Sequence, residues 1–110
     1  MQQIVIYNVE NSEQKHNLIT CLKEVCFILS DNDKSFLIMK DKQVKTIKYP
    51  QKTLLEVINE KEEFIKINKN TIINNSYFIA IEDKKKRFIL MKTGNILKVS
   101  RKKWDYFKLI

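Results

Sequence analysis

The stretch Phe64-Ile-Lys-Ile-Asn-Lys-Asn-Thr-Ile-Ile-Asn74, followed later by Val99-Ser-Arg-Lys-Lys-Trp104, is the most informative part of this sequence. Both stretches lie in the half of the chain that carries its excess charge. Residues 61–110 contain 13 Lys or Arg and 5 Asp or Glu, whereas residues 1–60 contain 8 of each. A Lys or Arg placed on a phosphate releases condensed counterions, so a regional positive field suits a polyanionic partner.

The composition predicts one globular domain. The chain has 110 residues, of which 44% are apolar, and it includes 6 Phe, 4 Tyr and 1 Trp. These values are typical of a chain that buries a core. With only 1 Gly and 1 Pro, the unusual backbone conformations are expected at Asn and Asp, which tolerate them better than other residues.

The cysteines and the single histidine predict no metal site and no disulfide framework. Cys21 and Cys26 are the only two cysteines, and two sulfurs with one histidine are too few for a zinc site. We expect free, buried or partly buried thiols in a reducing cytosol, and His16 on the surface. No signal peptide is recognisable and no segment approaches the length of about 20 apolar residues that a membrane helix needs, so we expect a cytoplasmic protein.

The apolar pattern predicts a mainly β chain with a small antiparallel sheet and one or two short helices. Strands are expected at 3–8, 25–29, 35–39, 44–49, 77–81, 87–91 and 96–99. A helix at 54–60 is predicted from the capping box Thr53-x-x-Glu56. A second helix at 101–109 is predicted with Ser100 as its cap and with Trp104 and Phe107 on its buried side.

Three short segments have their own predictions. The segment 11–23 stays open, because Asn11-x-x-Gln14 suits a helix cap while 18–22 suits a strand. Thr93-Gly94-Asn95 is expected to form a tight turn with positive φ at the glycine. The basic run Lys84-Lys-Lys-Arg87 is interpreted as the solvated tip of a hairpin.

Read together, the motifs from Val25 to Ile110 resemble the LytTR DNA-binding domain of bacterial transcriptional regulators. That family shows a D-I-x-Y-I-E strand, a helix with L-x-x-L, the pattern F-x-R-I-H-[RK]-S-[YF]-[ILV]-[VI]-N, and a V-S-R-[RK] segment that opens the last helix. The matching stretches here are Glu24-Val-Cys-Phe-Ile-Leu29, 54–58, the 64–74 stretch and Leu97-Lys-Val-Ser-Arg101. Their order and spacing agree over about 85 residues.

This sequence departs from the family pattern at several positions. Lys66 replaces the arginine, Asn68 the histidine, Asn70 the serine and Thr71 the aromatic residue, while Leu29 replaces the first strand's glutamate. Lysine keeps the positive charge of arginine but loses its bidentate fork. Phosphate binding is therefore expected to persist, while the preferred bases are expected to differ.

The resemblance implies an antiparallel β fold that binds double-stranded DNA through three loops, which enter successive major grooves along one face of the duplex. The loops correspond to the turn before Ser35, the segment 66–70 and the segment 100–102. Carried over by position, the base-contacting residues are Ser35, Lys69 and Arg101. Arg101 leads, because arginine can fork onto guanine O6 and N7. The phosphate-contacting or positioning residues carried over are Lys34, Lys66, Asn68, Asn70, Ser100 and Lys102. Asn74 is interpreted as structural, satisfying backbone groups in the turn that follows it.

The residues do not suggest an enzyme, since the chain shows no nucleophile elbow, glycine-rich phosphate loop, histidine pair or paired-carboxylate motif. Asp31-x-Asp33 is interpreted as part of a turn, and no cofactor or metal is expected. A basic nuclease or toxin remains as a distant alternative.

The leading hypothesis is a stand-alone, sequence-specific transcriptional regulator, because 110 residues leave no room for the receiver domain that many relatives carry. The resemblance implies two copies side by side on tandem direct repeats. Without a receiver domain, control is expected from protein level, an inhibitory membrane protein, or competition with a full-length regulator for the same sites. An excised domain of a larger protein is the alternative origin. The rival function is a basic protein-interaction module that no longer reads DNA.

Overall fold

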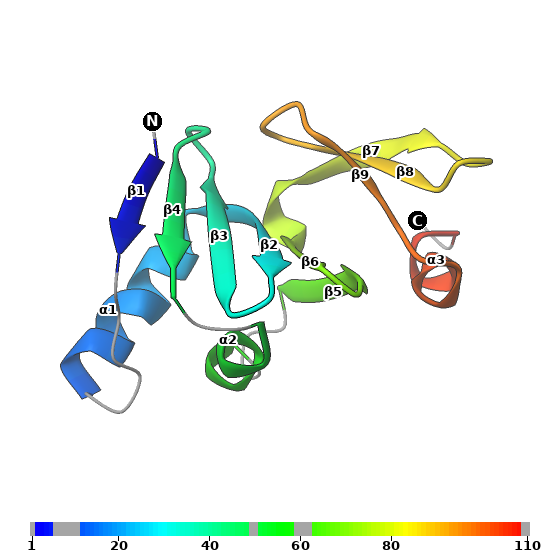
Figure 1. Cartoon of the computed structure of the whole chain (residues 1–110). Coiled ribbons are helices and arrows are strands. Elements are labelled where there is room, and N and C mark those ends of the chain that lie inside the picture. Colours follow the sequence, from blue (N-terminus) through cyan, green and yellow to red (C-terminus); the bar gives the residue numbers. More distant parts are fainter. Residues whose placement is uncertain (1, 6–11, 49–50, 59–62, 109–110) are drawn as a thin grey trace.

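The computed structural model describes residues 2–5, 12–48, 51–58 and 63–108 of the chain. Within these residues the backbone forms two β-sheets and three α-helices (Figure 1). In chain order the elements are β1 (Gln2–Val5), α1 (Ser12–Leu22), β2 (Val25–Asp31), β3 (Lys34–Met39), β4 (Val44–Ile47), α2 (Gln51–Ile58), β5 (Phe64–Asn68), β6 (Thr71–Asn74), the 3₁₀ turn η1 (Asn75–Tyr77), β7 (Phe78–Asp83), β8 (Phe88–Met91), β9 (Ile96–Lys98) and α3 (Arg101–Lys108). The predicted mainly β fold class is confirmed.

The larger sheet has six strands in the order β1-β4-β3-β2-β6-β5, and the smaller sheet has three in the order β7-β8-β9. Among the described strands, every pair is antiparallel except β1 and β4, which run parallel at the edge of the larger sheet. The predicted antiparallel architecture therefore holds with one parallel exception. The domain measures 43 × 27 × 24 Å along its principal axes.

The larger sheet is covered on both faces, so the chain has two hydrophobic cores. One core lies between this sheet and helices α1 and α2, and it contains Ile28 and Leu54. The other lies between the opposite face, the smaller sheet and α3, and it contains Phe27 and Phe107. Adjacent residues of β2 thus point into different cores, which explains why 25–29 is a continuous apolar run and not an alternating one.

Within the open segment 11–23, residues 12–22 form helix α1, so the described residues contain a third α-helix where one or two helices were expected. Leu18 and Leu22 of α1 lie four residues apart, share one helix face and are buried in the first core. Between them Thr20 is exposed, while Ile19 and Cys21 are half-buried against the same core. A pattern of two buried leucines over 11 residues is too sparse to separate a helix from a strand by periodicity.

The helix expected at 54–60 begins earlier, at Gln51. Thr53 is therefore the third residue of α2, and the predicted capping box is wrong. Several predicted residues lie outside the described ranges: 6–8, 49, 59–60 and 109. The C-terminal helix begins at Arg101 as expected, with Trp104 and Phe107 buried.

Positive φ angles occur at four described positions. Gly94 has φ +90°, as the turn 93–95 predicted, and Asn32 has φ +53° in the β2–β3 turn. Lys42 and Arg87 also adopt positive φ, at +75° and +57°, although neither residue type favours it. The expectation that asparagine and aspartate would supply such conformations is thus only partly correct.

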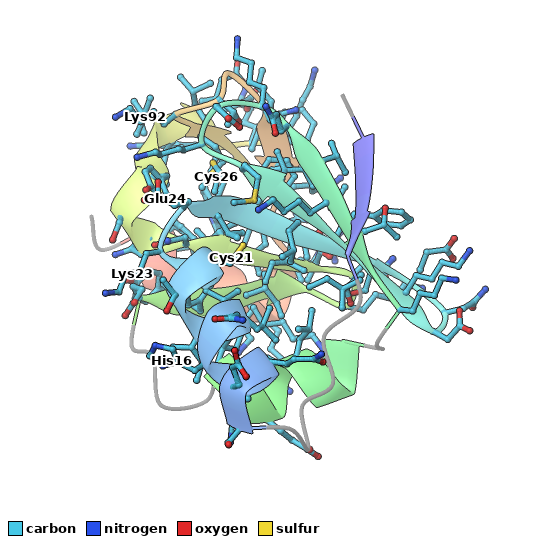
Figure 2. The ribbon with its side chains drawn as sticks, turned by 90° about the vertical axis from the view of Figure 1, so that its left-hand side faces the viewer. His16, Cys21, Lys23, Glu24, Cys26 and Lys92 are labelled. Carbon is cyan, nitrogen blue, oxygen red and sulfur yellow. The ribbon has the colours of Figure 1, made fainter. Side chains whose placement is uncertain are left out.

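His16 and Cys21 lie on helix α1, and Cys26 lies on strand β2 (Figure 2). Cys26 is buried and Cys21 is half-buried, and both are free, as expected. Lys45 Nζ donates to Cys21 Sγ at 3.7 Å, and His16 is exposed. In the part of the chain that the structure describes, no three His, Cys, Asp or Glu side chains gather as a metal site would require, and no helix is long and apolar enough to cross a membrane.

Asn74 joins two strands that are distant in sequence. Its side-chain Nδ2 donates to the carbonyl of Val25 at 3.0 Å, and its Oδ1 accepts from the backbone N–H of Ser76 at 3.0 Å. The residue is 3% exposed, so both partners would be left unsatisfied without it. The structural interpretation of Asn74 is confirmed.

We expect Asn74→Ala to lower the free energy of unfolding by about 1–3 kcal/mol, because it strands buried backbone groups. Urea unfolding followed by circular dichroism measures the change. Asn75→Ala removes the neighbouring, exposed asparagine side chain and should change stability by less than about 0.5 kcal/mol. Equal losses in the two variants would contradict this role.

Candidate nucleic-acid interface

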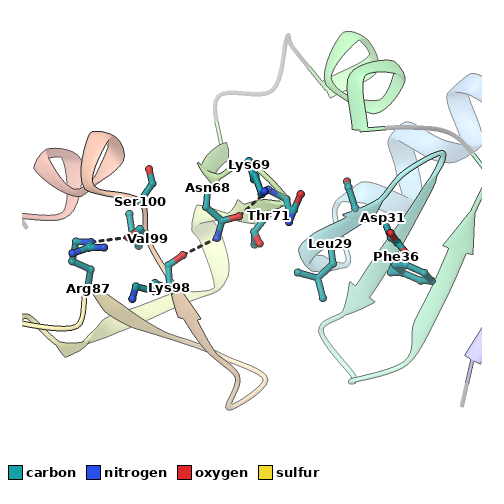
Figure 3. Close-up of a pocket in the computed structure, with 12 residues that line it drawn as sticks. Leu29, Asp31, Phe36, Asn68, Lys69, Thr71, Arg87, Lys98, Val99 and Ser100 are labelled. Carbon is teal, nitrogen blue, oxygen red and sulfur yellow. Dashed lines mark hydrogen bonds between the residues drawn. The ribbon is translucent and has the colours of Figure 1, made fainter.

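A groove of about 650 Å³ lies where three segments of the chain meet (Figure 3). The segments are the end of β2, the turn between β5 and β6, and the junction between β9 and α3. Its lining residues are Leu29, Ser30, Asp31, Phe36, Asn68, Lys69, Asn70, Thr71, Arg87, Lys98, Val99 and Ser100. Segments around residues 30, 70 and 100, the same regions as the three predicted loops, therefore border one hollow.

The β5–β6 turn is held by the side chain of Asn68. Its Oδ1 accepts from the backbone N–H of Asn70 at 2.8 Å, and its Nδ2 donates to the carbonyl of Lys98 at 2.8 Å (Figure 3). A further hydrogen bond runs from the N–H of Ser30 to the carbonyl of Asn70 at 2.9 Å. The turn is thus tied to β2 on one side and to β9 on the other.

The β9–α3 junction is fixed by a backbone hydrogen bond to β5 and by the N-terminal cap of α3. The N–H of Ser100 donates to the carbonyl of Ile67 at 2.8 Å, and Ser100 Oγ accepts from the N–H of Lys103 at 3.3 Å. The hydroxyl therefore caps α3, as predicted. A helix of 8 residues is unstable alone, and α3 is held to the second core by Trp104 and Phe107.

Arg87 belongs to this groove, although the sequence interpretation gave it to a solvated hairpin tip. Its Nε donates to the carbonyl of Val99 at 3.0 Å, and its own carbonyl accepts from the N–H of Val99 at 2.9 Å. The side chain is half-buried, whereas Lys84, Lys85 and Lys86 are exposed. The register of the β8–β9 hairpin, in which Phe88 pairs with Lys98, places residue 87 opposite residue 99.

The charges at the groove are mixed. Lys69, Arg87 and Lys98 supply three cations, and Asp31 supplies one carboxylate. Lys98 Nζ also lies 5.9 Å from the ring centroid of Phe88. The net positive charge favours a polyanion, while the carboxylate opposes one at the β2 end.

The predicted site residues are distributed unevenly around this groove. Four of them line it: Asn68, Lys69, Asn70 and Ser100. Arg101 and Lys102 are exposed and directly follow Ser100 in the first turn of α3. Lys34 is exposed, and its backbone lies opposite that of Asp31 where β2 and β3 join. Four of these seven residues therefore lie at the groove itself, and the other three lie on chain segments that adjoin its lining residues.

The burial of Ser35 contradicts the prediction that this residue contacts a base. Its side chain is 0% exposed, and its backbone pairs with Ser30 of β2 and Ile47 of β4. A base-contacting residue must present its polar atoms to the duplex, which a fully buried hydroxyl does not do. The exposed residues of this turn are Asp31, Asn32, Asp33 and Lys34.

Lys66 also lies apart from the groove. It is half-buried on edge strand β5 and pairs with Ile72, whose side chain belongs to the first core. Residues of β5 alternate between the two faces of the sheet, so Lys66 lies on the face that α2 covers. The structure therefore does not bring it together with Lys69.

Two comparisons with known proteins found a match. A family model described as "LytTr DNA-binding domain" matches residues 15–110. A solved structure, the LytTr DNA-binding domain of a putative methyl-accepting/DNA response regulator from Bacillus cereus, superposes with a TM-score of 0.64 at 21% sequence identity, covering 79% of this chain and 80% of that chain. A search of curated proteins found no match. At that identity the structural likeness supports the fold alone.

The Asn68 side chain can be tested as the tie between the turn and β9. Asn68→Asp keeps the acceptor for the Asn70 N–H and loses the donor to Lys98, whereas Asn68→Ala loses both. We expect the alanine variant alone to speed hydrogen exchange at the Asn70 amide, and each lost bond to cost about 0.5–1.5 kcal/mol. Amide exchange by NMR reads the first effect and urea unfolding reads the second. Unchanged exchange at Asn70 in Asn68→Ala would rule out this tie.

Proposed function

The chain belongs to the LytTR family of DNA-binding domains, and from this premise we propose that it is a transcriptional regulator that recognises a specific sequence in double-stranded DNA. The observation that carries the proposal is the groove, where the β5–β6 turn and the β9–α3 junction meet the end of β2 with three cations among the lining residues. In this proposal the protein acts in the cytoplasm, where the bacterial chromosome lies.

Arg101 is the proposed guanine reader. It is exposed in the first turn of α3, directly after Ser100, the residue that caps this helix. The cap and the bond from Ser100 N–H to Ile67 fix the backbone from which the side chain leaves. A guanidinium on a fixed backbone can form two parallel hydrogen bonds to guanine O6 and N7, which no other base pair offers in the same arrangement.

The remaining cations are proposed to position the duplex. Lys34, Lys98 and Lys102 are all exposed. Lys34 lies opposite Asp31 at the β2–β3 turn, and Lys98 and Lys102 lie at the end of β9 and in the first turn of α3. Contacts of this kind raise affinity for every sequence alike and make it depend on salt. Lys66, which lies on the other face of β5, is expected to contribute only through the long-range field.

The arrangement on DNA and the control of the domain are the next parts of the proposal. We propose that two copies occupy tandem direct repeats, and that control comes from protein level, competition for the sites, or an inhibitory partner such as a membrane protein. A protein-interaction role has one observation in its favour, the exposed side chains of Ile79 and Ile96 on the smaller sheet, at 54% and 50% exposure. These positions lie outside the groove, so such a role is compatible with DNA binding.

The central test is selection of binding sites from a random duplex library with the purified domain at near-physiological salt. Recovery of a shared motif supports a sequence-specific regulator. Weak, salt-sensitive binding without a motif would contradict specific recognition and favour the protein-interaction role. Metal-dependent cleavage of the DNA would instead indicate a nuclease.

Arg101→Ala should reduce affinity for the selected site by about 1–3 kcal/mol and relax the motif at one G·C pair. The matched control is Lys102→Ala, which removes the next exposed cation of the same helix turn. That variant should weaken all sequences alike and lower the salt slope by about one unit. Fluorescence anisotropy at several salt concentrations, with cognate and scrambled duplexes, measures both. Identical behaviour of the two variants would sink the assignment of Arg101.

Asp31→Asn should raise affinity for DNA of any sequence a few-fold at low salt, because it removes a carboxylate from the groove. The gain should shrink as salt rises and screens the charge. Asp41→Asn is the control at the opposite end of β3, where the side chain accepts a hydrogen bond from Gln43 N–H through an oxygen that asparagine retains. If both substitutions raise affinity equally, the β2–β3 turn does not face the DNA.

A further inference from the structure

Asn70 differs from its neighbours in the β5–β6 turn because both of its peptide groups are fixed while its side chain is exposed. Its N–H donates to Asn68 Oδ1 at 2.8 Å, and its carbonyl accepts from Ser30 N–H at 2.9 Å. Asn68 is itself bonded to Lys98 at 2.8 Å. The Cα of Asn70 is therefore held from three strands, and only two side-chain torsions remain free.

The two ends of the neighbouring asparagine are already used. The side-chain oxygen of Asn68 accepts from Asn70 N–H, and its side-chain nitrogen donates to the Lys98 carbonyl. Among the hydrogen bonds of the described residues, none involves the side-chain amide of Asn70, and this residue lines the groove. Asn70 thus presents one acceptor and one donor group side by side at the groove, from a fixed point.

The chemistry of this amide matches one base. Adenine shows an acceptor at N7 beside a donor at N6 in the major groove, which pairs with the donor and acceptor of an asparagine. Guanine shows two acceptors there, so the amide oxygen would face O6 without a proton between them. Cytosine and thymine each lack one of the two groups.

Lys69 is suited to the other task. Its ammonium carries donors only, on a flexible four-carbon stem, and it is exposed beside Asn70. Such a group follows a phosphate well but fixes a base poorly, because it must lose more side-chain freedom for each bond. The family pattern assigned base contact to the position of Lys69 and phosphate contact or positioning to that of Asn70.

We infer that these roles are exchanged in this chain: Asn70 reads an adenine in the major groove, and Lys69 contacts the phosphate backbone. This inference rests on the proposed function, because it names one base within the motif that a sequence-specific regulator would select. Since Ser100 N–H is bonded to Ile67 of β5, the adenine and the guanine read by Arg101 should keep a constant spacing within that motif.

The test compares binding motifs of the unaltered domain with those of Asn70→Ala and Lys69→Gln. Asn70→Ala keeps both backbone bonds of the turn, so it should fold normally. It should lose about 5- to 150-fold in affinity for the selected site and nothing for a site in which one A·T pair is replaced by G·C. Lys69→Gln should lose the same factor for every duplex and reduce the salt slope by about 0.9.

Asn70→Asp provides a gain-of-function arm. The substitution is nearly isosteric and leaves an acceptor-only side chain, which can accept from cytosine N4 and can no longer donate to adenine N7. We expect its selected motif to change from A to C at that one position, with lower affinity overall because of the added negative charge. A merely structural role for Asn70 would not produce a new base preference.

Two failures can be told apart. If the unaltered domain selects no motif, the proposed function falls and this inference falls with it. If it selects a motif that survives Asn70→Ala at every position, or if Lys69→Gln relaxes a base position instead, only the exchange of roles is overturned. Equal losses by Asn70→Ala on cognate and altered sites would also overturn it.

Discussion

The peptide group of Ile67 is the point on which the interface depends. The pairing of β5 with β6 shifts register between Lys66 and Asn68, which leaves the Ile67 carbonyl available to accept from Ser100 N–H at 2.8 Å. The same residue buries its side chain completely in the second core. A bulge of this kind bends the strand and redirects its neighbours. Because of it, the first turn of α3 and the β5–β6 turn belong to one rigid unit and do not move as separate loops.

Burial on both faces of the larger sheet supports that unit. Helices α1 and α2 cover one face and the smaller sheet with α3 covers the other, so the strands between them cannot slip by one residue without exchanging the contents of two cores. The fixed register also fixes the positions of the strand ends that border the groove. Asn74 reinforces it by bonding to Val25 from 49 residues away. Recognition by loops is physically reasonable when the loops are short and their ends are fixed in this way.

The sequence predicted the elements well and the side-chain roles less well. Most of the strands, the C-terminal helix with its Ser100 cap, the turn at Gly94 and the structural role of Asn74 followed from local patterns. Strands β5 and β6 did not, because the 64–74 stretch was not among the predicted strands. The burial of Ser35 was not predicted, because it depends on the strands on either side: Ser35 lies between Ser30 of β2 and Ile47 of β4, inside the sheet and not at the turn. The bond from Asn68 to Lys98 spans 30 residues, and no local pattern reports it. Asn68, which replaces the family's histidine, holds the β5–β6 turn through its bonds to Asn70 and Lys98.

The length of the domain sets how two copies can share a duplex. One turn of B-DNA rises about 34–36 Å, which is less than the 43 Å long axis of the domain and more than its 27 and 24 Å short axes. Copies lying lengthwise on one face would collide if their sites were one turn apart, so they need a wider interval. Copies lying across the duplex fit at one turn. The number of base pairs between repeats would therefore report the orientation of the protein on its operator.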